Sequence, residues 1–347
     1  MQKNTNEMPL YPPSFIDRIM RFFQRLSVPY WLTYLLLFAL ESVINHVLAW
    51  IDGWLPVFTV NKLLLVSPLW QWGTLAAITF LNVTSEAIIP SFRELLDIDD
   101  DMLEKLKYEF TTLPTRGVIL SGTIWIFAYL VLTYLSYDAI YVNYGLGSTY
   151  KVFIFLEGFI GYATGSVIYY HSIRQLWLVS RTVKMIKRFN LFHLGPIYDF
   201  SRLTSRTGIS WMFLLGMTLL LFPLGLAKGL TVAILGFQVI IALVAFVLPL
   251  RFVYYHLVLE KRRLLGELNQ QIELTVKRLH HSLDKDELDD AAQIGNALMG
   301  LNSEREILMG ISTWPWRTGT LTAFLSAVFL PIVLLLIQIV IQKWLGV

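Results

Sequence analysis

The chain has 347 residues, of which 55% are hydrophobic and only 15% are charged, and its formal net charge is +3 at pH 7. The charges lie in blocks separated by apolar runs long enough to cross a bilayer, which indicates an all-α, polytopic membrane protein. The sequence contains no cysteine, so disulfides, thiolate metal sites and cysteine-based catalysis are excluded, and nothing in the charge balance favours nucleic-acid binding.

Seven segments have the roughly 20 mostly apolar residues that a transmembrane helix needs. No cleaved signal peptide is evident before the first of them. The second segment is the least regular, because Pro68, Gln71 and Asn82 interrupt it. The expected spans are residues 30–50, 66–89, 118–137, 151–171, 208–227, 230–255 and 318–342.

The distribution of positive charge predicts the orientation of these spans. Twenty-four of the 28 Lys and Arg residues lie in the amino-terminal segment and in the segments 91–117, 172–207 and 251–317, which alternate with segments that hold one each. Because Lys and Arg are retained in the cytoplasm, we expect a cytoplasmic amino terminus and an external carboxyl terminus, in a plasma membrane or a prokaryotic inner membrane.

Three parts follow from this topology. Residues 1–255 are expected to form a six-span bundle with helical cytoplasmic loops at 91–117 and 172–207. Residues 256–317 are expected to form a cytoplasmic helical hairpin that serves as an anchor. Residues 318–347 then contain the seventh helix.

Ionisable residues at membrane depth are costly and therefore mark candidate functional sites. In the first span, Glu41 and Asn45 lie one helical turn apart with His46 beside them, and the fourth span contains Glu157 near its outer end. We expect these residues to line a vestibule or ligand cavity. An alternative is a transporter or carrier that works through Glu41, His46 and Glu157.

Two cytoplasmic loops have helical patterns. Asp101 and Glu104 have the spacing of a capping box and predict the start of a short amphipathic helix. After the fourth span, apolar residues between 176 and 189 are interleaved with Lys and Arg. This pattern predicts either a helix on an anionic leaflet or an extension of the fourth span that packs against neighbouring helices.

After the sixth span, leucines and β-branched residues recur at intervals of three and four, the spacing of a coiled-coil or bundle seam. The stripe predicts packing against other cytoplasmic helices or, alternatively, a seam between subunits. No metal site is expected at His280 and His281, because adjacent residues point to different faces of a helix. Ser303 and Glu306 have capping-box spacing and predict a new short helix that leads into the last span. The seam candidates are Leu265, Leu268, Ile272, Val276, Leu279 and Leu283.

The stretch before the last span combines aromatic residues with a proline and an arginine. Trp314 and Trp316 prefer the headgroup level, Arg317 can reach phosphates, and Pro315 prevents a continuous helix across the junction. The stretch is therefore expected to anchor the chain at the membrane surface and to act as a gating joint that transmits a rigid-body shift from the hairpin to the last helix.

The last helix is polar near both ends and apolar in the middle. Hydroxyl side chains share one face of its inner half, and two glutamines share a nearly opposite face of its outer half. Polar mouths around a hydrophobic midsection are typical of a pore that gates by dewetting, although a bundle helix whose hydroxyls bond their own backbone has the same composition. The pore-lining candidates are Thr322, Ser326, Leu330, Val333, Gln338 and Gln342.

The expected chain has seven spans, an internal amino terminus, short external loops, a helical cytoplasmic mass and a last span that follows a cytoplasmic helix. In this architecture it resembles the insect olfactory and gustatory receptor superfamily and its receptor-like relatives. The resemblance implies a tetrameric, ligand-gated cation channel whose last helices line a central pore and whose cytoplasmic helices form the anchor between subunits. The family's Thr-Tyr and Gln-Phe pairs in the last helix are missing, since Gln338 is followed by Ile339.

The expected function is an oligomeric ion channel, cation-conducting or non-selective, gated through cytoplasmic helices that are coupled to the last transmembrane helix. Phosphate-loop, hydrolase and zinc-protease motifs are missing, so an enzyme is not expected. The alternatives are a secondary transporter or a lipid or small-molecule carrier, and a membrane sensor or scaffold. The expected partners are the bilayer, further copies of the chain, permeant ions and a small-molecule ligand, with no cofactor.

Overall fold

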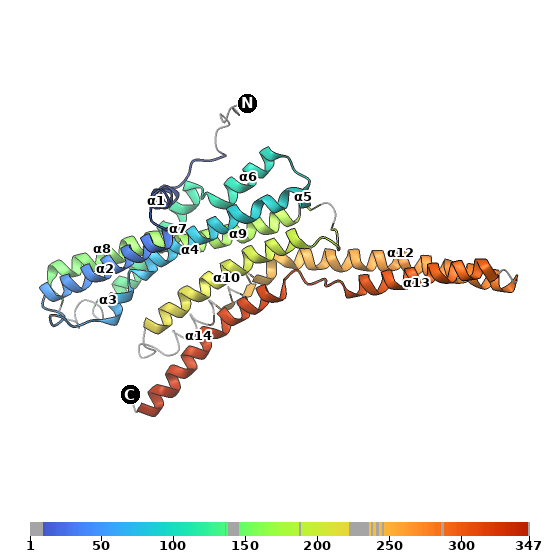
Figure 1. Cartoon of the computed structure of the whole chain (residues 1–347). Coiled ribbons are helices and arrows are strands. Elements are labelled where there is room, and N and C mark those ends of the chain that lie inside the picture. Colours follow the sequence, from blue (N-terminus) through green and yellow to red (C-terminus); the bar gives the residue numbers. More distant parts are fainter. Residues whose placement is uncertain are drawn as a thin grey trace.

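The computed structural model describes residues 10–135, 137, 146–186, 189–221, 236, 239–240, 243–244, 246–285 and 288–345, without the side chains of 215, 217–221, 331–332, 334–336 and 338–345. Over these residues the chain is helical, and the only β-type pairing is an isolated bridge between Pro13 and Pro114. The helices form an elongated bundle from which a hairpin of two long helices projects (Figure 1). The all-helical prediction is confirmed for the described part of the chain.

Four helical stretches within the described residues are long and apolar enough to cross a membrane, as in a multi-pass membrane protein. They coincide with the first four predicted spans. The four stretches are α2 (Tyr30–Ile51), the run of α3 (Lys62–Val66), α4 (Leu69–Ile88), η1 (Ile89–Ser91) and α5 (Phe92–Leu96), then α7 (Thr115–Leu135), and the run of α8 (Ser148–Gly165) and α9 (Val167–Val183). The second stretch is longer than predicted because α3 precedes α4 and because η1 and α5 follow it. The fourth is longer because α9 continues α8.

The other three predicted spans are described only in part. Residues 222–235 and most of 237–245 lie outside the described part of the chain, and with them much of the spans 208–227 and 230–255. The described piece of the fifth span belongs to α10 (Gly195–Leu221), which packs against the last helix, α14 (Thr318–Leu345). In α14 the apolar stretch over described side chains is Thr318–Leu330, which is shorter than a full crossing.

The amino-terminal helix α1 (Phe15–Gln24) begins with a capping box. The backbone N–H of Asp17 donates to Ser14 Oγ at 3.2 Å, and the N–H of Ser14 donates to the Asp17 carboxylate at 2.9 Å. The helix α6 (Asp100–Thr111) has its N-cap at Asp99, two residues before the predicted cap at Asp101, which is therefore wrong. Asp99 has the extended backbone that a cap needs, and its Oδ1 accepts from Met102 N at 2.9 Å.

The basic stretch after the fourth span continues the bundle as α9. Val179 and Val183 are fully buried, and Leu178 is 1% exposed. Their neighbours in the core come from α5, α6 and α10, and Arg181 pairs with Glu109 of α6. Of the two predicted arrangements, the structure therefore shows the extension packed against neighbouring helices and not a helix lying on the leaflet.

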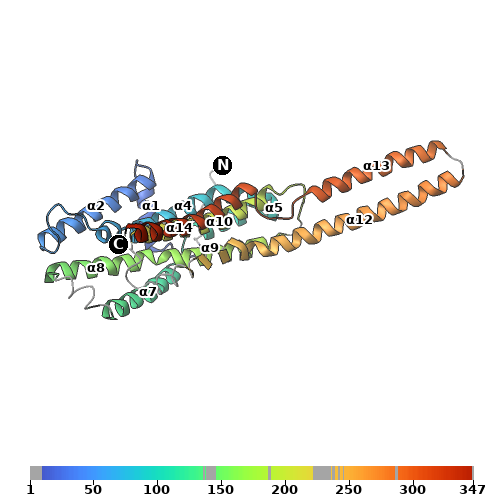
Figure 2. The ribbon, with the colours of Figure 1, turned by 90° about the horizontal axis from the view of Figure 1, so that it is seen from below.

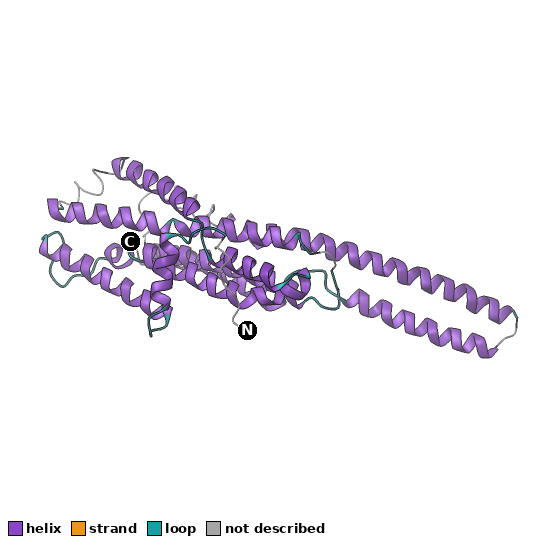
Figure 3. Cartoon of the chain, turned by 90° about the horizontal axis from the view of Figure 1, so that it is seen from above, coloured by secondary structure: helices purple, strands orange, loops and turns teal. Residues whose placement is uncertain are grey.

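The hairpin consists of α12 (Arg251–Asp284), which follows the short η3 (Leu248–Leu250), and α13 (Leu288–Gly310). At about 1.5 Å per residue α12 is about 50 Å long, and most of the hairpin stands clear of the other helices (Figures 2 and 3). The predicted new helix at Ser303 and Glu306 is wrong. α13 runs without a break through both residues, because no proline and no left-handed turn interrupts it there.

Candidate functional site

A polar contact between α2, α8 and the residue that follows α3 joins two of the predicted intramembrane residues. Asn45 Nδ2 donates to Glu157 Oε1 at 2.8 Å, and the Ser67 hydroxyl donates to the same oxygen at 3.1 Å. Asn45 is fully buried, and its Oδ1 has no hydrogen-bond partner among the described residues. Within that part of the chain Glu157 forms no ion pair, so this carboxylate is held by neutral donors.

The other two predicted intramembrane residues have separate partners. Glu41 accepts from the indole Nε1 of Trp72 on α4. His46 Nδ1 lies 2.7 Å from Ser42 O, and the backbone N–H of Asn61 donates to His46 Nε2 at 3.1 Å. Because Nε2 accepts, the ring is the neutral tautomer with its proton on Nδ1. The four residues therefore do not form one cluster, and His46 fastens the segment before α3 to α2.

Sequence reasoning missed a second polar layer, which joins α4, α9 and α10 nearer the hairpin. His171 Nε2 lies 2.9 Å from Asn82 Oδ1, Gln175 Nε2 donates to Ser85 Oγ at 3.1 Å, and Thr207 Oγ1 donates to Gln175 Oε1 at 3.1 Å. All five side chains are buried. The signal in the sequence was the pair His171 and Gln175, which are one turn apart on an otherwise apolar helix face.

The helix α14 has one packed face and one uncovered face. Phe324 is 1% and Val328 5% exposed, and both pack against Met212 of α10 and against Phe246. The opposite side of α14 is exposed, with Phe329 as a bulky example. The predicted pore residues on this exposed side are Thr322, Ser326, Leu330 and Val333.

The hydroxyl of Thr322 donates to its own helix, to Thr318 O at 2.9 Å. This is the backbone bonding expected of a hydroxyl on any helix in a bundle. The other two pore candidates, Gln338 and Gln342, lie outside the described side chains.

The joint between α13 and α14, residues 311–317, is packed into the same cluster as the buried face of α14. The Trp316 ring stacks on Phe246 with centroids 5.2 Å apart, and Phe246 stacks on Phe324 at 3.9 Å. Pro315 is buried beside them, while Trp314 remains 58% exposed. The joint therefore cannot move without disturbing the aromatic stack that positions α14.

Two basic residues tether the joint. Lys261 of α12 donates from Nζ to Met309 O at 2.8 Å and to Ile311 O at 2.6 Å, where the carbonyl end of α13 favours positive charge. The Arg317 guanidinium lies 5.2 Å from the ring centre of Tyr198 on α10. Arg317 is exposed and stacks on this ring, and its reach to lipid phosphates stays a prediction.

The predicted seam on α12 packs within one chain. Leu268 is 4% exposed, and four of the other five are half-buried, whereas Leu283 is 49% exposed. Because α13 is the described helix that runs beside this part of α12 (Figure 2), this burial comes from α13. Of the two predicted roles of the stripe, the structure shows packing against another helix of the same chain, α13.

The outward face of α13 is a surface that sequence reasoning did not single out. Residues 291–303, with the sequence AAQIGNALMGLNS, contain no charged side chain. Ala291 is 7% exposed and faces α12, whereas Met299 is 63% exposed and Ala292 and Asn296 are also exposed. A helix that projects into water normally has a charged outer face. We call this surface the uncharged α13 face.

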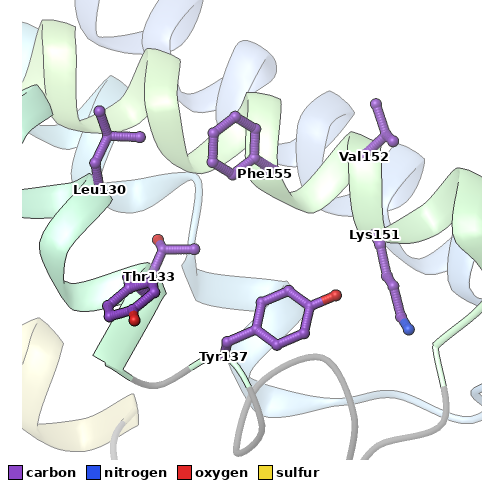
Figure 4. A pocket seen from close by; sticks show the side chains of 7 residues that line it. Leu130, Thr133, Tyr137, Lys151, Val152 and Phe155 are labelled. Atoms are coloured by element: carbon purple, nitrogen blue, oxygen red, sulfur yellow. The ribbon is translucent and has the colours of Figure 1, made fainter.

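A separate apolar pocket of about 350 Å³ lies between the ends of α7 and α8 farther from the hairpin (Figure 4). Leu130, Val152 and Phe155 supply apolar walls, and Lys151 contributes the amine at its edge. None of the predicted site residues lines this pocket. It therefore gives no support to a ligand cavity built around Glu157.

Comparison of the chain with protein-family models, with curated proteins and with solved structures found no match. The contacts of the chain's own residues are therefore the basis for inferring its function.

Proposed function

We propose that the chain forms an oligomeric ion channel, cation-conducting or non-selective, in which copies of α14 surround the pore. The observation that carries this proposal is the uncovered face of α14, which presents Thr322 and Ser326 together with Leu330 and Val333. Hydroxyls beside a hydrophobic constriction form the kind of wall on which a narrow pore wets and dewets.

In this proposal the chain crosses the membrane seven times, with its amino terminus inside and its carboxyl terminus outside. The last three crossings are α10, the segment 230–255 and α14. The alternation of Lys and Arg supports this topology. So does the placement of α5, α6 and the hairpin toward one end of the bundle, with α3 and the end of α14 toward the other (Figure 1).

The proposed partner of the uncharged α13 face is a second copy of the chain. Exposed apolar surface on a projecting helix is the usual mark of an interaction site, and identical hairpins around one axis would cover one another's faces. Four copies with a cytoplasmic anchor would match the architecture of the insect olfactory and gustatory receptor superfamily, which the sequence resembles.

Gating follows from the tethers of the joint. Lys261 fixes the end of α13 to α12. Trp316 stacks on Phe246, which stacks on Phe324, and this connects the joint to the packed face of α14. A shift of the hairpin would therefore move the start of α14 as a rigid body. A signal received by the cytoplasmic helices would reach the pore in this way.

A second candidate function, a secondary transporter or carrier, is favoured by the contact of Asn45 and Ser67 with Glu157. A carboxylate at membrane depth that is held by neutral donors has a site for a proton or another cation to come and go. A carrier of this kind works as a monomer or dimer and gives saturable flux without unitary currents.

Electrical recording of the purified chain in planar bilayers tests the proposal. We expect unitary currents whose conductance or selectivity changes when Ser326 or Thr322 is substituted. If both substitutions leave conductance and selectivity unchanged, the pore wall is wrong. Saturable flux without unitary currents would instead support the carrier.

A further inference from the structure

A polar cavity of about 290 Å³ lies between α1, α4 and α6, away from α14 and from Glu157. The residues of α1 that line it are spaced i, i+3, i+4 and i+7, so they form one face of that helix. The two residues from α4 are one turn apart. The lining residues are Asp17, Met20, Arg21, Gln24, Asn82, Glu86 and Thr111.

The cavity lies level with the beginning of the first candidate span. The hydroxyls of Tyr34 and Thr79 are 2.9 Å apart, and Ser42 Oγ donates to Leu65 O at 2.8 Å, so α2 and α4 run antiparallel in this register. Asn82 is about one turn beyond Thr79 and is therefore level with the start of α2. A cavity at the end of a membrane-crossing helix lies at the depth of lipid headgroups.

Asp17 presents a buried oxygen without a partner beside this cavity. Its Oδ2 accepts from Ser14 N, Ser14 Oγ and Leu113 N at 2.9, 2.7 and 3.0 Å, whereas its Oδ1 has no partner among the described residues. The residue is 1% exposed, and this burial raises the pKa of its carboxyl above the ordinary value of 3.8. The donors already present therefore do not offset the burial of a full negative charge.

The remaining charged groups of the cavity have opposite signs. Glu86 is an exposed carboxylate without a hydrogen bond to any described residue. Arg21 lines the same wall and donates from one guanidinium nitrogen to Thr112 Oγ1 at 3.1 Å. Two carboxylates beside one guanidinium complement a ligand that has a positive and a negative pole.

We propose that this cavity binds a primary ammonium linked to a phosphate, the chemistry of a phosphoethanolamine group. The ammonium has three N–H donors for the carboxylates of Asp17 and Glu86, and the phosphate pairs with Arg21. A bare metal cation fits less well, because Arg21 repels it. The volume lies just below the range for pockets that bind drug-sized ligands, about 300 to 1,000 Å³, which suits a headgroup and excludes larger organic molecules.

Titration calorimetry on the full chain in phosphatidylcholine nanodiscs tests the proposal with free phosphoethanolamine. We expect saturable binding by the wild type and binding weaker by about tenfold or more in Glu86→Gln, since a hydrogen bond to a charged group is lost. Glu86 is the residue of choice because Asp17 also caps α1, so its substitution risks the fold. Glu104→Gln removes an exposed carboxylate of α6 outside the cavity and should bind like the wild type.

Phosphocholine is the matched ligand, because its quaternary ammonium has no N–H donor, and it should bind at least about tenfold more weakly. A second arm uses nanodiscs that contain both phosphatidylethanolamine and phosphatidylcholine, with native mass spectrometry of the retained lipid. Retention of phosphatidylethanolamine by the wild type but not by Glu86→Gln identifies a lipid headgroup as the source, whereas binding in the first arm alone identifies a soluble ligand. Binding in neither arm, equal binding by Glu86→Gln, or equal binding of phosphocholine overturns the proposal.

Discussion

The most informative substitution in the hairpin is Met299→Glu, on the uncharged α13 face. If copies of the chain assemble through this face, a carboxylate there is buried between subunits without a partner. The side chain points away from α12 and is 63% exposed in the single chain. The substitution should therefore break the assembly and leave the fold of each subunit intact.

The size of the effect follows from that exposure. Complete burial of a methionine contributes about 1.5–3 kcal/mol, so covering the exposed part of Met299 contributes about 1–2 kcal/mol at each interface. Glutamate forfeits this contribution and adds the desolvation of an unpaired charge, which costs several kcal/mol. A total loss of about 3 kcal/mol or more weakens association by over about a hundredfold, at about 1.4 kcal/mol per tenfold.

Mass photometry of the detergent-solubilised chain over a dilution series measures the assembly, and the thermal unfolding midpoint reports the fold of the subunit. Leu274→Glu is the matched control, because Leu274 is 57% exposed on the outer face of α12, where Lys277 pairs with Glu273 at 2.6 Å. We expect Met299→Glu to dissociate at concentrations where the wild type and Leu274→Glu remain assembled. A wild type that is monomeric, or a Met299→Glu variant that assembles normally, would refute this reasoning.

Three further predictions concern the joint, the buried carboxylate and the amino-terminal cap. Lys261→Met keeps the apolar stem but loses both hydrogen bonds to the end of α13, so backbone hydrogen exchange in the joint should accelerate by about fivefold. Lys277→Met is the control and should leave exchange in the joint unchanged. Equal exchange rates in both variants would show that Lys261 does not hold the joint in place. Glu157→Gln keeps an acceptor for Asn45 and should unfold near the wild-type midpoint, whereas Glu157→Ala leaves a buried donor unpaired and should cost about 1–3 kcal/mol. A Glu157→Gln variant as unstable as Glu157→Ala would contradict that assignment. Because the pKa of Asp17 is raised above 3.8, the native chain holds the carboxyl proton more tightly than the unfolded chain does. The stability that Asp17 contributes is therefore present at low pH and falls as the pH rises above 3.8. The unfolding midpoint of the ligand-free wild type should decline relative to that of Asp17→Asn over this pH rise, and a constant difference between the two midpoints would speak against a buried ionising carboxyl.

Features that depend on length and local pattern could be predicted from the sequence. Apolar length identified α2, α4, α7 and α8, because each residue of a helix adds a fixed rise and the bilayer sets the total. Periodicity likewise identified the apolar stripe on α12. It could not show what covers that stripe, because periodicity reports which face is apolar and not which neighbour packs on it.

Features that depend on tertiary contact could not be predicted. Asn45 and Glu157 are 112 positions apart in the sequence, and only the packing of α2 against α8 brings them together. Capping-box spacing misled at Ser303 because the same pattern also occurs inside a continuous helix. The uncharged α13 face went unnoticed because its significance arises from the projection of the hairpin away from the bundle (Figure 3).

The central claim is that the uncovered face of α14 borders water in the assembled protein. The chain has no cysteine, so a single-cysteine variant has one reactive thiol. Leu120→Cys on α7 is the matched control, because Leu120 is 63% exposed on a candidate span outside the proposed pore.

The most direct measurement is modification of Ser326→Cys by a charged, membrane-impermeant methanethiosulfonate reagent during electrical recording. The proposed pore predicts that the reagent irreversibly changes the current through Ser326→Cys and leaves Leu120→Cys unaffected. If the thiol of Ser326→Cys resists the charged reagent and reacts only with a lipid-soluble maleimide, α14 faces lipid and the pore assignment is wrong.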